Sequence, residues 1–395
     1  MVANREEMFK QRAWQEVDRL RNRLVEISRA IHARPELGGE ELFASKLLSD
    51  ELERAGFVVR RNYFDIPTAF HAVFQGRTVR PAVALLAEYD ALPGIGHGCG
   101  HNIIGTAAVG AALALVPLLG SIDGSIHVYG TPAEETNGAK VPLADRGAFK
   151  DIDAAMMIHP SGCTVLAAPS LAMDALEFTF IGRTAHAAAA PHEGLNALDA
   201  VILTFNAINT LRQRLRPDVR IHGIITKGGV VANMIPEKAV ARFHVRAETR
   251  EHVNKVVPKV IDCAQGAALA TGTQLKVGNF EYSFDEMRTN TALAQAMHKN
   301  LISLGEEVLT GGEGWGSLDM GNVSQVVPAI HPYISIGPAN LVSHTREFAQ
   351  AAKGPGAMRG LIVGAKALVA TALDVFFNPA LLTAAWEEFR AGTSF

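Results

Sequence analysis

The strongest constraint on the fold is an alternation of short apolar runs with helical segments in the N-terminal part of the chain. Runs typical of buried strands occur at Pro81–Ala87, Ser125–Thr131 and Ile152–His159. Between them lie an uncharged segment from Ile103 to Ile122 and a shorter one at Ala139–Gly147, both of which we predict to be helices. Strands that alternate with helices favour an α/β fold with a mostly parallel sheet covered on both faces.

The pattern changes after Leu171. The run Asp174–Ile181 alternates apolar and polar residues, as a strand with one exposed face does. The elements predicted next are a helix at Asn196–Leu215, strands at Arg220–Thr226 and Ala239–Arg246, and a helix at Glu251–Ala270. This order describes a small α+β domain.

From Phe284 the α/β pattern resumes. We predict helices at Asn290–Leu304 and Pro355–Leu373 and an apolar strand at His331–Ile336. The sequence therefore predicts a discontinuous domain of residues 1–171 and 284–395, into which a small domain of residues 172–283 is inserted.

The composition narrows the choice of partners and compartment. Lys and Arg number 37 and Asp and Glu 40, so the near-neutral chain has no electrostatic footprint for nucleic acid or an anionic membrane. Three cysteines are too few for a disulfide scaffold, and the first residues include no apolar leader segment, so we expect a cytoplasmic protein. The uncharged segment Ile103–Ile122 is long enough to cross a bilayer, but it contains Pro117 and many small residues, and we interpret it as a buried helix.

Residues that bind metals or transfer protons gather just after the predicted strands, where open α/β sheets place their ligands. They are Glu88, Asp90, His97, Cys99 and His101 after the first strand, Glu134 and Glu135 after the second, His159 at the end of the third, and His344 after the strand at His331–Ile336. A thiolate and an imidazole two residues apart can face one ion when glycines free the backbone. Adjacent carboxylates repel each other unless a cation or a proton lies between them.

Each of these features alone has a structural explanation. A Cys-x-His pair is more often a buried thiol beside a core histidine, and a Glu-Glu pair is more often a solvated turn. Four separate strand ends that each supply a metal-binding type of residue are much harder to attribute to chance. The sequence therefore predicts a metal site at this edge of the sheet.

Several motifs together resemble the M20 family of metallopeptidases and amidohydrolases, in particular its aminoacylase-like and aminobenzoyl-glutamate-hydrolase-like branch. The motifs are AEYDALPGIGHGCGHN, PAEE, IHP and SHT, and the resemblance begins as early as the run Ile31–Leu37. It implies a zinc-peptidase-like catalytic α/β domain with a mixed sheet, interrupted by a small α+β lid or dimerisation domain. That agrees with the insertion predicted from the pattern.

The resemblance also implies a site with two divalent metal ions per subunit, Zn²⁺ or Mn²⁺, with Co²⁺ as a further alternative. The residues that match the family's ligands are Cys99, His101, Glu135, His159 and His344. Glu134 matches the general base and Asp90 the carboxylate that orients the metal centre. His97 matches no ligand in this branch. Asn102 stands where related enzymes often have Asp, which removes a nearby charge and leaves the ligand set intact.

The predicted inserted domain contains a second set of residues that match the family. His186 matches a histidine that stabilises the oxyanion, often from the other subunit of a dimer. Asn233 and Arg246 match residues that hold a substrate carboxylate, and we expect them on adjacent strands, although alone they would be a turn-capping Asn and a solvated Arg. The glycine-rich run Gly311–Gly321 resembles the family's active-site loop, in which Trp315 either lines an aromatic pocket or packs in the core.

The expected activity is metal-dependent hydrolysis of the amide bond of an N-acyl amino acid, an aminobenzoyl-glutamate-like or a dipeptide-like substrate. Glu134 would take a proton from a water activated by the metal, and the substrate would carry a carboxylate. Two alternatives stay open: the same site could hydrolyse another C–N bond, such as that of a substituted aromatic amine, or the protein could bind metal without turnover. We expect a homodimer formed through the inserted domain.

Overall fold

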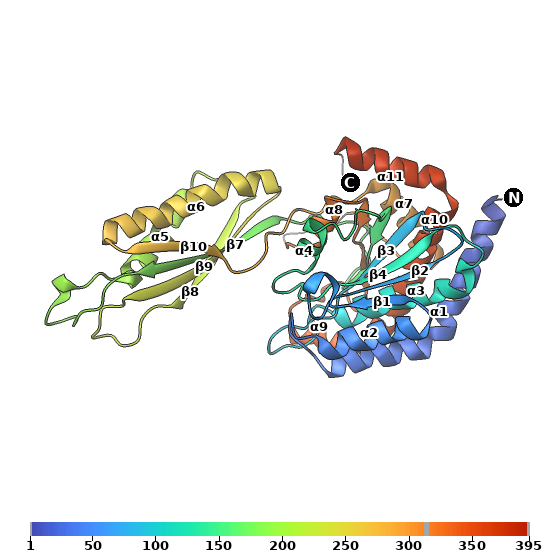
Figure 1. The fold of residues 1–395 in the computed structure, drawn as a ribbon, viewed down its shortest axis with the longest axis horizontal. Coiled ribbons are helices and arrows are strands. Elements are labelled where there is room, and N and C mark those ends of the chain that lie inside the picture. The colour runs from blue at the N-terminus through green and yellow to red at the C-terminus, as the bar shows by residue number, and fades with distance from the viewer. Residues whose placement is uncertain (1, 312–315, 393–395) are drawn as a thin grey trace. The chain divides into compact units, whose positions relative to one another are not determined.

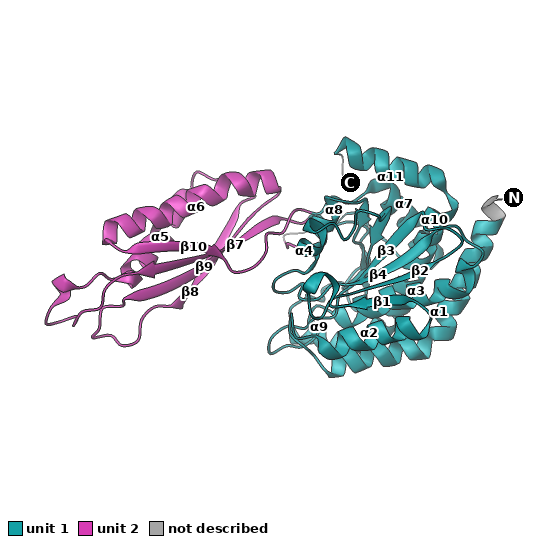
Figure 2. Cartoon of the chain, viewed as in Figure 1, with its two compact units in different colours: residues 1–169, 287–314, 319–395 teal, residues 170–286, 315–318 magenta. Residues whose placement is uncertain are grey.

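The computed structural model describes residues 2–311 and 316–392. The contacts divide the chain into two compact units, coloured teal and magenta in Figure 2. Unit 1 contains residues 1–169, 287–314 and 319–395, and unit 2 contains residues 170–286 and 315–318.

Unit 1 is built on a mixed six-stranded sheet with the order β1-β2-β4-β3-β5-β11. Figure 1 labels β1, β2, β3 and β4 of this sheet. The strands are β1 (Val58–Arg61), β2 (Phe70–Gln75), β4 (Ser125–Gly130), β3 (Ala82–Ala87), β5 (Ala154–Met156) and β11 (Ala329–Ile330). The last four are parallel, whereas β1 and β2 pair antiparallel to their neighbours. β3 is buried along its whole length, as its uniformly apolar sequence predicts.

A group of long helices forms the core of unit 1 with this sheet. α1 (Val2–Ala33), α3 (His101–Leu119) and α10 (Pro355–Phe377) pack against one another, and α3 also packs on β3 and β4. The other helices of the unit are α2 (Leu42–Arg54), α4 (Lys140–Asp145), α7 (Thr291–Ser303), α8 (Met320–Ser324), α9 (Arg346–Ala351) and α11 (Pro379–Ala391). A short 3₁₀ turn, η1, spans Tyr63–Asp65.

Two helices of the described chain, α3 and α10, are long and apolar enough to cross a membrane. In both, 83% of the most apolar window is buried inside the protein. Both are core helices of unit 1. For α3 this confirms the interpretation of the uncharged segment Ile103–Ile122 as a buried helix.

One predicted strand is wrong in its extent. The run Ile152–His159 contains β5, but His159 begins another strand, β6 (His159–Ser161), which pairs in parallel with β12 (Tyr333–Ser335) in a separate two-stranded sheet. The apolar sequence continues through both strands, so hydrophobicity alone does not show where the chain leaves the first sheet.

Unit 2 is an antiparallel four-stranded sheet with two helices. The sheet has the order β10-β7-β9-β8, and its strands are β7 (Ala172–Ile181), β8 (Arg220–Lys227), β9 (Lys238–Ala247) and β10 (Gln274–Asn279). α5 (Ala197–Arg212) and α6 (Arg250–Thr271) pack on each other and on the central strands, which gives the unit its own apolar core. The 3₁₀ turn η2 (Pro191–Glu193) lies in the connection before α5. β10 was not predicted, because most of its residues are polar and exposed.

Candidate metal centre

Three parallel strands of unit 1 end at the same edge of the sheet, and the predicted site residues follow them. Asp90 lies three residues after β3, Glu134 and Glu135 follow β4, and His159 follows β5. Because parallel strands bring their carboxyl ends to one edge, residues that are distant in the sequence meet there.

Glycine controls how the chain presents Cys99 and His101. Gly100 lies between them with φ +76°, a left-handed conformation that L side chains rarely adopt. A Cβ at this position would lie 2.5 Å from Cγ of Pro160, so the backbone also approaches the chain after His159 very closely. α3 begins at His101, which places this imidazole on the first turn of a buried helix.

The structure brings all five predicted ligands together in overlapping groups. Cys99 Sγ lies 3.4 Å from His159 Nε2, and His344 Nε2 lies 3.2 Å from Glu135 Oε1. His101 Nε2 is 3.8 Å from Glu135 Oε1. Three sets each have ligand atoms within 4.8 Å of one another: Cys99, His101 and His159; Cys99, Glu135 and His344; and Glu88, His101 and Glu134.

Buried hydrogen bonds orient two of the imidazoles. His101 Nδ1 donates to Asp90 Oδ1 at 2.8 Å, while Asp90 Oδ2 accepts the backbone N–H of Glu135 at 2.9 Å. His159 Nδ1 donates to the carbonyl of Pro160 at 2.8 Å. In both histidines Nε2 is the nitrogen left for a ligand, which is the usual arrangement of metal-binding imidazoles.

The donor set fits divalent cations. His101 Nε2 and Glu88 Oε2 are buried and have no hydrogen-bond partner among the described residues. Leaving such atoms unpaired in one place costs free energy unless an ion binds them. Thiolate, imidazole and carboxylate together suit Zn²⁺, and the imidazole and carboxylate donors also suit Mn²⁺ and Co²⁺.

The pKa shifts within the cluster also fit a cation-binding site. Burial, together with the charge of Glu135, raises the pKa of the Cys99 thiol. Burial favours neutral His101, but its contact with Asp90 outweighs this effect and raises the pKa of the imidazole. Burial lowers the pKa of His159 to about 4. Metal binding would therefore displace protons from Cys99 and His101.

Two neighbouring residues of the motif lie outside this cluster. His97 is buried with Nε2 3.1 Å from the carbonyl of Ile31, and burial lowers its pKa to about 3. Asn102 donates to Ser28 Oγ at 2.9 Å and to the carbonyl of Ala352 at 3.1 Å. Both residues secure the start of α3 to other parts of unit 1.

The residues predicted in the inserted domain form two separate groups within unit 2. His186 and Asn233 lie side by side, because the N–H of Ala187 donates to the carbonyl of Asn233 at 3.0 Å. Arg246 lies near the other end of β9, about eight strand residues or ~26 Å beyond the first residue of that strand. The expected placement of Asn233 and Arg246 on adjacent strands is wrong, because Asn233 lies in the loop before β9. Trp315 lies outside the described residues.

The comparisons with known proteins agree with this geometry. The sequence profile of Peptidase family M20/M25/M40 matches residues 84–374, a span that includes every residue of the cluster. The chain belongs to this M20 family. It is therefore a metal-dependent hydrolase that acts on C–N amide bonds.

Two curated relatives cover nearly the whole M20 chain. Xaa-Arg dipeptidase of Homo sapiens is 39% identical over 97% of this chain and 92% of its own length. A subunit of the p-aminobenzoyl-glutamate hydrolase of Escherichia coli is 30% identical over 94% of this chain and 93% of its own length.

Solved structures show the same fold. An aminobenzoyl-glutamate utilization protein from Klebsiella pneumoniae superposes with a TM-score of 0.74 at 17% identity, covering 91% of this chain and 97% of the other. A dinuclear metal-binding M20 peptidase from Bacillus subtilis has a TM-score of 0.66 at 20% identity, covering 91% and 99%.

Sequence reasoning missed one residue that shapes the loop of the M20 chain that contains Glu134. Glu41 is fully buried, and its carboxylate accepts the N–H of Ala133 at 2.7 Å and the hydroxyl of Thr68 at 2.8 Å. Ala133 directly precedes Glu134 and has φ +61°, which is strained for a residue with a Cβ. No sequence signal distinguishes Glu41 from the acidic residues around it, since its role depends on contacts with residues distant in the sequence.

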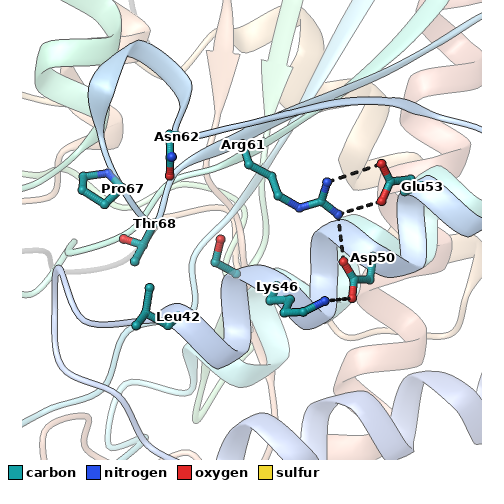
Figure 3. Close-up of a pocket in the computed structure, with 9 residues that line it drawn as sticks. Leu42, Lys46, Asp50, Glu53, Arg61, Asn62, Pro67 and Thr68 are labelled. Carbon is teal, nitrogen blue, oxygen red and sulfur yellow. Dashed lines mark hydrogen bonds and ion pairs between the residues drawn. The ribbon is translucent and has the colours of Figure 1, made fainter.

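A pocket of about 570 Å³ beside α2 is not the candidate site. Its charged groups neutralise one another: Arg61 Nη2 binds Asp50 at 2.8 Å and Glu53 at 2.9 Å, and Lys46 also binds Asp50 (Figure 3). The residues that line it lie between 42 and 68, which excludes every residue of the cluster. Thr68 links this pocket to the site through its hydrogen bond to Glu41.

Proposed function

We propose that this M20 protein hydrolyses the amide bond of dipeptide-like substrates that have a free carboxylate, and that Xaa-Arg dipeptides are the first substrates to test. The observation that supports this most strongly is the convergence of Cys99, His101, Glu135, His159 and His344, with Glu134 beside them. The names of the two curated relatives add the substrate classes: a dipeptide with C-terminal arginine and p-aminobenzoyl-glutamate.

We propose that two divalent ions bind the cluster. One would be held by Cys99, His101 and His159, and the other by Cys99, Glu135 and His344. Ions of this kind would lower the pKa of water, so that it can lose a proton and attack an amide near neutral pH. They would also stabilise the charge that develops on the carbonyl oxygen. The thiolate favours Zn²⁺ over Mn²⁺ or Co²⁺.

Glu134 is proposed to be the general base. Burial and the nearby carboxylates of Glu88 and Glu135 raise its pKa, so its carboxylate is more basic than an exposed one. A stronger base takes the proton of the attacking water more readily and then, as an acid, returns it to the leaving amine. Asp90 supports this arrangement by binding both His101 and the backbone of Glu135.

Arg246 is proposed to bind the substrate carboxylate. Its Nε is buried without a hydrogen-bond partner among the described residues, and burial lowers the pKa of the guanidinium. A partly desolvated guanidinium without a partner favours an anion that accepts two hydrogen bonds.

His186, which we propose as an oxyanion donor, accepts the N–H groups of Ala188 and Ala189 at Nδ1, so its Nε2–H is free to donate.

The separation of these two groups supports a homodimer. His186 and Asn233 are roughly a whole strand length away from Arg246, which is much longer than a dipeptide. We propose that one group serves the subunit's own site and the other serves the partner's site. The edge strand β8 and the loop after it offer exposed apolar side chains for the contact, namely Ile224, Ile225, Val230, Val231 and Met234.

A substrate screen tests the proposal. Metal-free protein is reconstituted with Zn²⁺, Mn²⁺ or Co²⁺ and assayed with an Xaa-Arg dipeptide, p-aminobenzoyl-glutamate, an N-acyl amino acid and an aromatic amine. We expect hydrolysis of at least one carboxylate-bearing amide and none of the aromatic amine. Turnover of the amine alone would contradict the proposal.

A further inference from the structure

Next to the five predicted ligands lies a buried ion cluster, of which the proposed mechanism uses only the charge of Glu88. The ammonium of Lys140 is fully buried and binds Glu88 Oε1 at 2.6 Å and Asp319 Oδ1 at 2.7 Å. Glu88 follows β3, Lys140 begins α4 and Asp319 precedes α8, so three distant segments of unit 1 meet here.

The two carboxylates of this cluster differ in what their second oxygens do. Asp319 Oδ2 accepts the backbone N–H of Lys140 at 3.1 Å, so both of its oxygens are bound within the cluster. Glu88 Oε2 is buried without a hydrogen-bond partner among the described residues. It lies 3.5 Å from His101 Nε2, and Glu88, His101 and Glu134 have ligand atoms within 4.8 Å of one another.

The charges of the cluster do not balance. Asp319 alone would neutralise Lys140, so Glu88 adds a second negative charge to a site from which water is excluded. Glu88 Oε2 has no hydrogen bond among the described residues and only the 3.5 Å contact with His101 Nε2, so its burial is costly, and a cation in direct contact would remove most of that cost. Oε2 of Glu88 faces Nε2 of His101, the nitrogen that would bind a metal ion.

We propose that Glu88 is a further ligand of the metal centre, and that Lys140, which binds its other oxygen, is the positioning residue that holds it there. The inference rests on the proposed function only in requiring that a divalent cation binds near His101. Lys140 fixes Oε1 of Glu88, and this leaves Oε2 as the oxygen directed at the ion.

The chain contains a matched pair of variants for the test. Glu88→Gln and Asp319→Asn each remove one negative charge from the surroundings of Lys140 with little change in volume, but only Glu88 has the unpaired oxygen. Zn²⁺ affinity of the full-length metal-free protein is measured by calorimetry against a competing chelator. The visible spectrum of the Co²⁺-loaded protein reports the ligand geometry.

We expect Glu88→Gln to weaken the binding of one Zn²⁺ by about tenfold or more and to change the Co²⁺ spectrum. Asp319→Asn should stay within about threefold of the parent and keep its spectrum. Equal effects of the two variants, or no effect of Glu88→Gln, would overturn the inference, because Glu88 would then serve only to neutralise Lys140.

Two further outcomes remain informative. If Glu88→Gln does not fold, Glu88→Asp keeps the charge but shortens the side chain, and it should show the same loss of affinity; parent-like affinity in Glu88→Asp would overturn the inference. If the parent protein itself binds no Zn²⁺, the proposed function fails, a result distinct from a parent that binds Zn²⁺ equally well with or without Glu88.

Discussion

Glu134 and Glu135 are neighbours in the chain but lie in different electrostatic surroundings. Burial and the charges of Glu88 and Glu135 raise the pKa of Glu134. At Glu135 burial also favours the neutral form, but the contact with His344 and the charge of His101 outweigh it and lower the pKa. The local environment therefore suits Glu134 to the proposed role of base and Glu135 to the proposed role of ligand.

Replacing the proposed base should separate catalysis from metal binding. Glu134→Gln keeps the volume but cannot accept the proton of water, so we expect kcat to fall by at least about 10²-fold. Metal content, measured by atomic emission, should match that of the parent. A kcat above about a tenth of the parent value would contradict the assignment of Glu134 as general base.

Cys99 should release a proton when metal binds, because burial keeps its thiol protonated in the metal-free protein. Calorimetry in two buffers of different ionisation enthalpy counts the protons released. Cys99→Ser should bind less Zn²⁺ and release about one proton fewer, and Zn²⁺ affinity of the parent should rise with pH. Cys263→Ser, a change in α6 of unit 2, is the control, and equal behaviour of the two variants would remove Cys99 from the ligand set.

The residues of the candidate metal cluster could be chosen from the sequence, but the residues that support them could not. Cys99, His101 and Glu135 occur in short motifs next to apolar strands, so local sequence indicates their chemistry. Glu41 and Lys140 act through contacts with residues far along the chain, at Ala133 and Asp319 respectively. A single sequence contains no local pattern that records such contacts.

Among the elements, the buried ones were predicted best. β3 begins one residue after the start of its predicted run, because a fully buried strand is uniformly apolar. The edge strand β1, with the sequence VVRR, is mostly exposed and was missed. Its partner β2 mixes polar and apolar residues and was also missed, so the antiparallel side of the sheet was predictable only from the family resemblance.

The pairing of β2 with β4 should make the protein sensitive to acid. His71 Nε2 lies 2.9 Å from His127 Nδ1, and burial lowers the pKa of His71 to about 3. Since an unfolded histidine titrates near 6.5, the unfolded chain binds more protons below that pH. Stability is therefore full above pH 6.5 and is lost as the pH falls towards about 3.

Urea unfolding of the chelated protein measures this loss. Between pH 6.5 and 5.5, His71 should reduce the free energy of unfolding by about 1 kcal/mol. His71→Phe should remove that part of the pH dependence, although it should be less stable at neutral pH because His127 Nδ1 loses its partner. Replacing the exposed His192 should change nothing, and a His71→Phe protein with the parent's pH dependence would contradict the argument.

At the scale of the whole molecule, the proposed division of labour assigns metal chemistry to unit 1 and substrate recognition to unit 2. Arg246→Ala should lower kcat/KM for a substrate with a free carboxylate by a factor equivalent to about 1.5–3 kcal/mol. The same amide with its carboxylate amidated should be affected little. Arg246→Lys should restore activity only in part, because an ammonium lacks the planar two-bond geometry.

Arg242 is the matched control for this prediction. It lies on the same strand, β9, but it is more exposed and binds Glu177 at 2.7 Å. Arg242→Ala should leave kcat/KM close to the parent value. If Arg246→Ala weakens both substrates equally, the residue supports the structure of unit 2 and does not recognise the carboxylate.

The central claim is that the cluster around Cys99 and His101 holds two metal ions on which amide hydrolysis depends. The most direct measurement titrates Zn²⁺ into metal-free protein while hydrolysis of an Xaa-Arg dipeptide is followed and metal bound per chain is counted. We predict no turnover without metal and full activity at two equivalents. Turnover that persists in protein shown by elemental analysis to contain no metal would contradict the account.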